Sequence, residues 1–125
     1  MLAMQDLVLL VADKQMEFAL RGALSRPQAL QIRPISFEFR SHMGRDGGVR
    51  ATGPEVLFGE RSRFAHALML LDHEGCGQEN LGVDVLEAEL DRRLHANWGP
   101  NAKAIVIEPE VDVFCSIAWI RHFAE

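Results

Sequence analysis

The segment Ala67–Gly75, with the sequence ALMLLDHEG, decides the fold class, because an unbroken apolar run leads directly into Asp72, His73, Glu74 and Gly75. A run without polar alternation is typical of a strand that is covered on both faces in a parallel sheet. The polar residues then mark the carboxyl end of that strand, where open parallel sheets place their binding crevice. We therefore expect an α/β fold with a site at Asp72 and Glu74.

The same pattern recurs on both sides of this segment. Leu7–Ala12 and Ala104–Ile107 are further apolar runs, and an acidic residue follows each of them. Residues Gln31–Arg40 alternate in polarity and also favour a strand, in which Pro34 indicates an edge position or a late start. These runs predict the four strands of one sheet.

Helical periodicity fills the segments between the strands. The predicted helices are Lys14–Leu24, Pro54–Phe64, Val83–His95 and Val111–Phe123. Glycine-rich Ser41–Gly53 is interpreted as a long loop, and Gly75–Gly82 as a shorter one. Alternating strands and helices predict right-handed crossovers and a mainly parallel four-stranded sheet with flanking helices. We expect a single α/β domain over residues 1–125.

The composition narrows the class of protein. The chain has 125 residues and a formal net charge of −5, so it lacks the basic surface of a stand-alone nucleic-acid binder. Its two cysteines have no metal-finger spacing. Leu7–Ala12 is too short to span a bilayer and no basic signal segment precedes it. We expect a cytoplasmic protein without membrane contact.

Acidic residues at the predicted strand ends suggest a site for a hard cation, Mg²⁺ or Mn²⁺. Asp72 and Glu74 can direct carboxylate oxygens at one ion, although acids are also common in solvated turns. Glu110 and Asp112 form a second pair, whose alternative role is to stabilise the start of the last helix.

Two further groups of polar residues lie beside these pairs. Asp13 and Glu17 are placed to face the same crevice, but the pattern favours Asp13 as the cap of the helix that follows it. His42 and Arg45 are candidates to bind phosphate or nucleic acid, and the alternative is an ordinary surface loop.

Four segments of the chain resemble the TOPRIM-like domains of topoisomerases, primases and OLD-type nucleases. They are Val11–Glu17, His42–Gly47, Asp72–Gly77 and Glu108–Asp112. More narrowly, the sequence is similar to a small TOPRIM-related protein of bacterial methylation-associated defence systems. Such domains carry a glutamate after the first strand, an Asp-x-Asp type pair after a later strand, and further acids beyond.

The resemblance implies a magnesium-dependent nuclease of phage defence that acts on nucleic acid together with a partner protein. Asp72, Glu74, Glu110 and Asp112 would then hold the metal. The usual first glutamate is replaced by Ala12, so Asp13 or Glu17 would have to position or deprotonate a water.

Two alternatives remain open at this point. The first is a non-catalytic assembly subunit of a defence complex, a short form without a C-terminal extension, whose last helix exposes apolar side chains to another subunit or a second copy. Those side chains are Phe114, Ile117, Trp119, Ile120 and Phe123. The second is a receiver-type phosphoacceptor at Asp72, but Lys103 precedes its strand instead of following it.

Overall fold

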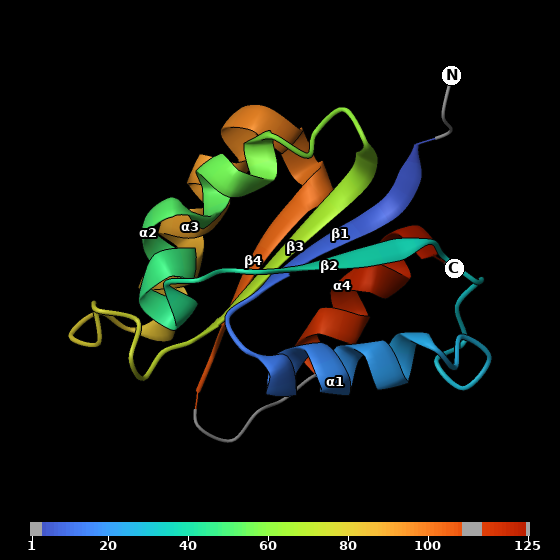
Figure 1. The fold of residues 1–125 in the computed structure, drawn as a ribbon, viewed down its shortest axis with the longest axis horizontal. Coiled ribbons are helices and arrows are strands. Elements are labelled where there is room, and N and C mark those ends of the chain that lie inside the picture. The colour runs from blue at the N-terminus through green and yellow to red at the C-terminus, as the bar shows by residue number, and fades with distance from the viewer. Residues whose placement is uncertain (1–3, 109–113, 125) are drawn as a thin grey trace.

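The computed structural model describes residues 4–108 and 114–124, which form a four-stranded parallel sheet between two layers of helices (Figure 1). The strands pair in the order β2-β1-β3-β4, and their bounds are β1 Gln5–Val11, β2 Phe37–Ser41, β3 Phe64–Asp72 and β4 Ala102–Ile107. The helices are α1 Lys14–Leu24, α2 Arg45–Phe58, α3 Val83–Trp98 and α4 Phe114–Ala124, and the 3-10 turn η1 Gly99–Asn101 precedes β4. This architecture confirms the expected α/β fold.

The core of the molecule lies on both faces of β1 and β3. Helices α1 and α4 cover one face of the sheet, and α2 and α3 cover the other (Figure 1). The apolar runs Leu7–Val11 and Ala67–Leu71 are almost completely buried. Each leucine buried in this way contributes on the order of 1.5–3 kcal/mol. The unbroken apolar sequence of both strands therefore reflects burial from two sides.

Helix α2 occupies most of the segment that glycine content predicted as a loop, so the loop prediction for Ser41–Gly53 is wrong. The glycines here permit close contacts instead of turns. A Cβ atom at Gly53 would lie 2.5 Å from the Sδ atom of Met69, and one at Gly48 would lie 2.4 Å from Nδ1 of His42. Glycine thus lets the helix lie directly on the sheet and on the His42 ring.

Pro54 lies inside α2, whereas the sequence placed it in the first turn of a helix Pro54–Phe64. Proline has no N–H to donate to the carbonyl of Arg50, four residues earlier. Arg93 of α3 compensates, because its guanidinium donates to the carbonyl oxygens of Arg50 (3.0 Å) and Ala51 (2.8 Å). A neighbouring helix therefore allows α2 to continue through the proline.

The other elements follow the sequence pattern more closely. Helix α1 has the predicted bounds, and α3 starts at Val83 as expected but continues to Trp98. Strand β2 starts only at Phe37 and lies at the edge of the sheet, as Pro34 indicated.

Helix α4 packs on the sheet, so the expectation that its apolar side chains are exposed is wrong for the buried Ile117 and Ile120. Phe123 stacks on His66 with ring centroids 3.8 Å apart, and Trp119 contacts both rings edge-on. The side chain of Phe114 lies outside the described part of the chain. Among the described helices, none is both long and apolar enough to cross a membrane.

Candidate metal and phosphate site

Two aspartates flank the point where the topology of the sheet reverses. Asp13 follows β1 and Asp72 ends β3, and these neighbouring strands lead to connections on opposite faces of the sheet. Such a switch point opens a crevice at the carboxyl ends of the strands. The fold therefore places both predicted site residues where an α/β sheet has room for a ligand.

Asp13 is held in place by the helix that it caps. Its Oδ1 atom accepts a hydrogen bond from the backbone N–H of Met16 (2.9 Å), in an extended backbone conformation typical of an N-cap. The capping role predicted from the sequence is thus confirmed. It fixes the carboxylate at the crevice, with its second oxygen outside that bond.

Asp46 joins the site from the first turn of α2. Its Oδ1 atom accepts a hydrogen bond from the backbone N–H of Asp72 (2.7 Å). The bond connects the start of α2 to the end of β3, so two carboxylates from distant parts of the chain meet at the switch point. Asp46 is not among the site residues predicted from the sequence, where Ser41–Gly53 was interpreted as a loop.

Burial and neighbouring negative charges raise the pKa values of Asp72 and Asp46. Burial raises the pKa of Asp72 above its ordinary value of 3.8, and the charges of Asp46, Asp13 and Glu74 raise it further. The pKa of Asp46 is also raised, first by burial and then by the charge of Asp13, against the lowering effect of its bond to the Asp72 N–H. The charges of Asp46, Asp13 and Glu74 therefore all act on Asp72.

One oxygen of this cluster lacks a partner. Asp72 Oδ1 is buried, and in the described part of the chain it accepts no hydrogen bond. A buried carboxylate oxygen without a donor is unfavourable unless a cation or proton neutralises it. Oxygen donors of this kind suit Mg²⁺ or Mn²⁺. Nevertheless, no three His, Cys, Asp or Glu side chains within residues 4–108 and 114–124 are already arranged as a metal site.

The loop after β3 is anchored by several bonds. The His73 N–H donates to the carbonyl of Ile107 (2.7 Å), and its ring Nε2 bonds the carbonyl of Leu81 (2.6 Å). Gly75 has a φ of +87°, which favours glycine and turns the chain away from the strand at the start of the predicted loop Gly75–Gly82. Arg50 of α2 donates to the carbonyl of the buried Cys76. These bonds therefore fix the conformation of the loop that follows Asp72.

A pocket of about 590 Å³ adjoins the acids at the carboxyl ends of β1 and β2. Its charged lining consists of Asp13, Lys14 and Arg45, and both cationic side chains are exposed. Arg45 adopts a φ of +56°, uncommon for a residue with a side chain. The pocket is thus locally basic on an acidic chain, which suits an anionic ligand.

His42 also lines this pocket, but both of its ring nitrogens have partners within the chain. Nδ1 accepts from the N–H of Gly44 (2.8 Å), and Nε2 lies 2.7 Å from Oγ1 of Thr52. An accepting Nδ1 leaves the ring proton on Nε2, which can then donate to the Thr52 hydroxyl. These bonds assign His42 a role in ordering the start of α2.

The remaining predicted residues lie apart from the cluster or outside the description. Glu17 forms an ion pair with Arg21 (3.0 Å) on α1, and its charge does not contribute to the raised pKa of Asp72. Glu74 is exposed next to Asp72. Glu110 and Asp112 fall outside the described residues. Lys103 lies at the opposite end of β4 and pairs with Asp91 (2.8 Å), which does not favour a receiver-type site.

Comparisons with known proteins add no relative. No protein-family model matches the chain, and searches of curated proteins and of solved structures found no match. The TOPRIM-like resemblance therefore stays a prediction that rests on the sequence motifs.

Proposed function

We propose that the chain binds a divalent cation, Mg²⁺ or Mn²⁺, with Asp13, Asp46 and Asp72, and that it acts in phosphoryl transfer on nucleic acid. The observation that carries this proposal is the buried, unpartnered Oδ1 of Asp72 among carboxylates that raise its pKa. A divalent cation relieves that repulsion and supplies the missing partner at the same time.

Each residue has a distinct part in this proposal. Asp72 is the central ligand, because its free oxygen has no competing donor in the described chain. Asp46 is oriented by the Asp72 N–H and Asp13 by the Met16 N–H, so small shifts of these two side chains complete the ligand set. Glu74 adds a further carboxylate from the adjacent loop.

The pocket next to the acids is proposed to hold the phosphate. Lys14 and Arg45 line it together with Asp13, and each is exposed and able to donate to phosphate oxygens. A bound cation would lower the pKa of a coordinated water and stabilise negative charge on the phosphate. Asp13 borders both the acids and the pocket, so we assign it the role of positioning that water.

The narrower assignment, a nuclease of bacterial phage defence in the cytoplasm that works with a partner protein, rests on the motif resemblance. The net charge of −5 favours such a partner, because the chain alone attracts polyanions weakly.

Cation binding and cleavage test the proposal separately. Isothermal titration with Mn²⁺ should give a saturable site in the wild type that Asp72→Asn weakens by tenfold or more, on the order of the loss of one charged ligand. Glu79→Gln, an exposed acid in the following loop, is the matched control and should bind normally.

Labelled DNA and RNA oligonucleotides then report the chemistry. We expect Mn²⁺-dependent cleavage that falls about 100-fold or more in Asp72→Asn, the size typical of losing a main electrostatic stabiliser. Undiminished cleavage by Asp72→Asn would refute the assigned site. A wild type that binds the cation but cleaves no oligonucleotide would refute the nuclease and leave the cation site standing.

A further inference from the structure

The outer edge of β2 pairs with no other strand in the described part of the chain, and its sequence is self-complementary. β2 is the last strand on its side of the sheet, and β1 is its one neighbour among the described strands. The Leu7 N–H donates to the Ser36 carbonyl and the His42 N–H to the Val11 carbonyl, so even-numbered residues direct their backbone groups toward β1. The backbone groups of Phe37, Phe39 and Ser41 consequently face outward.

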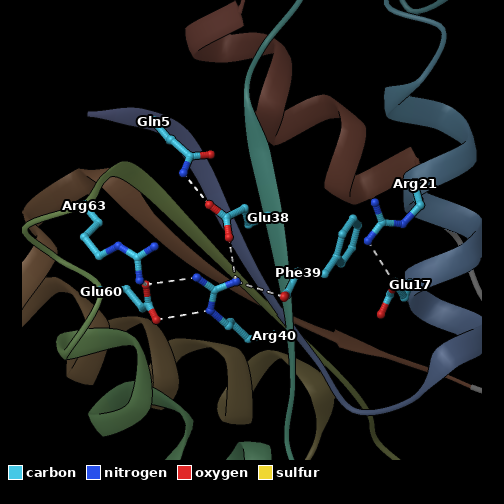
Figure 2. A network of polar contacts seen from close by, with 8 residues as sticks. All are labelled: Gln5, Glu17, Arg21, Glu38, Phe39, Arg40, Glu60 and Arg63. Atoms are coloured by element: carbon cyan, nitrogen blue, oxygen red, sulfur yellow. Dashed lines mark hydrogen bonds and ion pairs between the residues drawn. The ribbon is translucent and has the colours of Figure 1, made fainter. Parts of the chain in front are cut away.

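The side chains of this edge alternate between two faces (Figure 2). Glu38 and Arg40 lie on one side, where Arg40 bonds Glu38 (3.1 Å) and Glu60 (3.2 Å), and Gln5 also donates to Glu38. Phe39 lies on the other side beneath Arg21 of α1, whose guanidinium carbon is 4.8 Å from the ring centre. Charge thus occupies one face of the edge and aromatic surface the other.

We propose that a second copy of this chain adds its β2 antiparallel to this edge, about a two-fold axis through Phe39. The axis makes Phe39 face Phe39 of the other copy as a hydrogen-bonded pair. Glu38 then stands opposite Arg40 of the other copy, and Arg40 opposite its Glu38. These are non-hydrogen-bonded positions, where facing side chains come closest. Charge complementarity therefore favours a second copy of this chain as the partner that binds the β2 edge.

The aromatic face of the edge also favours pairing with a second copy of this chain. Phe37 and Phe39 are only partly buried and contact each other edge-on at 5.9 Å. Phe18 on α1, one turn before Arg21, is 74% exposed. A two-fold axis at Phe39 would bring these side chains from both copies onto one face and shield them from water.

In the isolated chain, a side-chain hydrogen bond competes with this pairing and keeps it reversible. Arg40 donates to the outward carbonyl of its neighbour Phe39 (3.1 Å), which is an acceptor that strand addition needs. In the pair, the N–H of Phe39 from the other copy replaces that donor, and Arg40 turns to the facing Glu38. Charged side chains of this kind limit uncontrolled edge-to-edge association, so we expect a concentration-dependent dimer that stops at two copies.

Charge reversal with complementation tests this arrangement by sedimentation velocity. Glu38→Lys and Arg40→Glu each place like charges across the axis, so each variant alone should dimerise at least about tenfold more weakly than the wild type. An equimolar mixture of the two restores opposite charges at both positions and should form a heterodimer. Glu89→Lys, an exposed charge reversal on α3, should dimerise like the wild type.

Hydrogen exchange of the backbone amides provides a readout that does not depend on Arg40→Glu folding. The amide of Phe39 should become protected as the wild-type concentration rises, while those of Glu38 and Arg40, bonded to β1, stay protected at every concentration. In Glu38→Lys the Phe39 amide should exchange rapidly throughout. A wild type that is monomeric up to about 1 mM, beyond any useful affinity, would overturn the proposal, as would single variants that dimerise normally.

Discussion

Asp72 is the residue on which the proposed site depends. Its raised pKa predicts the direction in which the stability of the fold changes with pH. The folded chain holds the Asp72 proton more tightly than the unfolded chain, whose ordinary pKa is 3.8. Ionisation therefore costs stability as the pH rises from 3.8 through the pKa of the folded state, and the cost persists at neutral pH.

Asp72→Asn should accordingly raise the melting temperature at pH 7 in the presence of a chelator, because it removes the cost of burying a charged carboxylate and, with it, the repulsion with Asp46, Asp13 and Glu74. The gain should disappear below pH 3.8, where the unfolded chain is protonated as well. Thermal unfolding by circular dichroism measures both effects, with Glu79→Gln as the control. A variant that melts below the wild type at pH 7 would contradict this electrostatic account.

Asp46 contributes a different interaction, the acceptor for the Asp72 N–H. Asp46→Ala removes that acceptor, whereas Asp46→Asn keeps an oxygen in the same place. We expect the alanine variant to be less stable than the asparagine variant by about 1–3 kcal/mol, the cost of an unsatisfied backbone donor. Urea unfolding of the two variants compares them directly, and equal stability would show that the bond is unimportant.

At the scale of elements, α2 depends on glycine for contact with the sheet. Gly53→Ala should destabilise the protein by about 1–3 kcal/mol, because the new Cβ would lie 2.5 Å from Met69 Sδ and 3.2 Å from Leu10 Cδ2. Gly22→Ala in α1 is the matched control, since nothing lies within 4 Å of its Cβ position. It should stabilise the helix by about 0.5–1 kcal/mol. Denaturant unfolding measures both changes in the free energy of unfolding. If both substitutions changed it in the same direction, the explanation of the glycine-rich helix would be refuted.

Pro54 and Arg93 should be energetically coupled. In the wild-type chain, Arg93→Ala leaves the carbonyls of Arg50 and Ala51 without the guanidinium and should cost about 1–3 kcal/mol. After Pro54→Ala, a backbone N–H can bond the Arg50 carbonyl, so the same Arg93 substitution should cost less. A double-mutant cycle measures this difference, and strict additivity would contradict the compensation. Arg92→Ala, exposed on the same helix, is the control.

The elements that the sequence predicted correctly are those with local signals. Helix α1 starts at an Asp13 cap and ends before Ser25 and Pro27, and β1 and β3 are unbroken apolar runs. The first part of helix α2, before Pro54, was missed because its glycines are required by close contacts with Met69, Leu10 and His42, which are tertiary contacts that composition does not reveal. Missing the helix start also hid Asp46, since an acid in the first turn after an edge strand reaches the same sheet end.

At the scale of the whole molecule, the strand order brings the site together. β1 and β3 are neighbours although α1, β2 and α2 lie between them in sequence, so Asp13 and Asp72 meet across the switch point. The strand-end acids predicted this meeting in outline. The role of Glu17 could have been read from the sequence, because Arg21 lies four residues after it on the same helix, a spacing that favours an ion pair.

The proposed cation site and the β2 edge lie in different parts of the fold. The two proposals can therefore be tested, and refuted, independently. The site uses the carboxyl ends of β1 and β3 with the start of α2, whereas dimerisation uses the outer edge of β2. Glu38→Lys should therefore leave Mn²⁺ affinity unchanged, and Asp72→Asn should leave the dimer unchanged. Titration calorimetry and sedimentation on both variants check this separation.

The most direct test of the central claim is a Mn²⁺ titration followed by nuclear magnetic resonance of the backbone amides. Substoichiometric Mn²⁺ should broaden the signals of Asp13, Asp46 and Asp72 first, excess Mg²⁺ should restore them, and Asp72→Asn should abolish the effect. Broadening centred elsewhere, or broadening at these three residues that persists unchanged in Asp72→Asn, would contradict that claim.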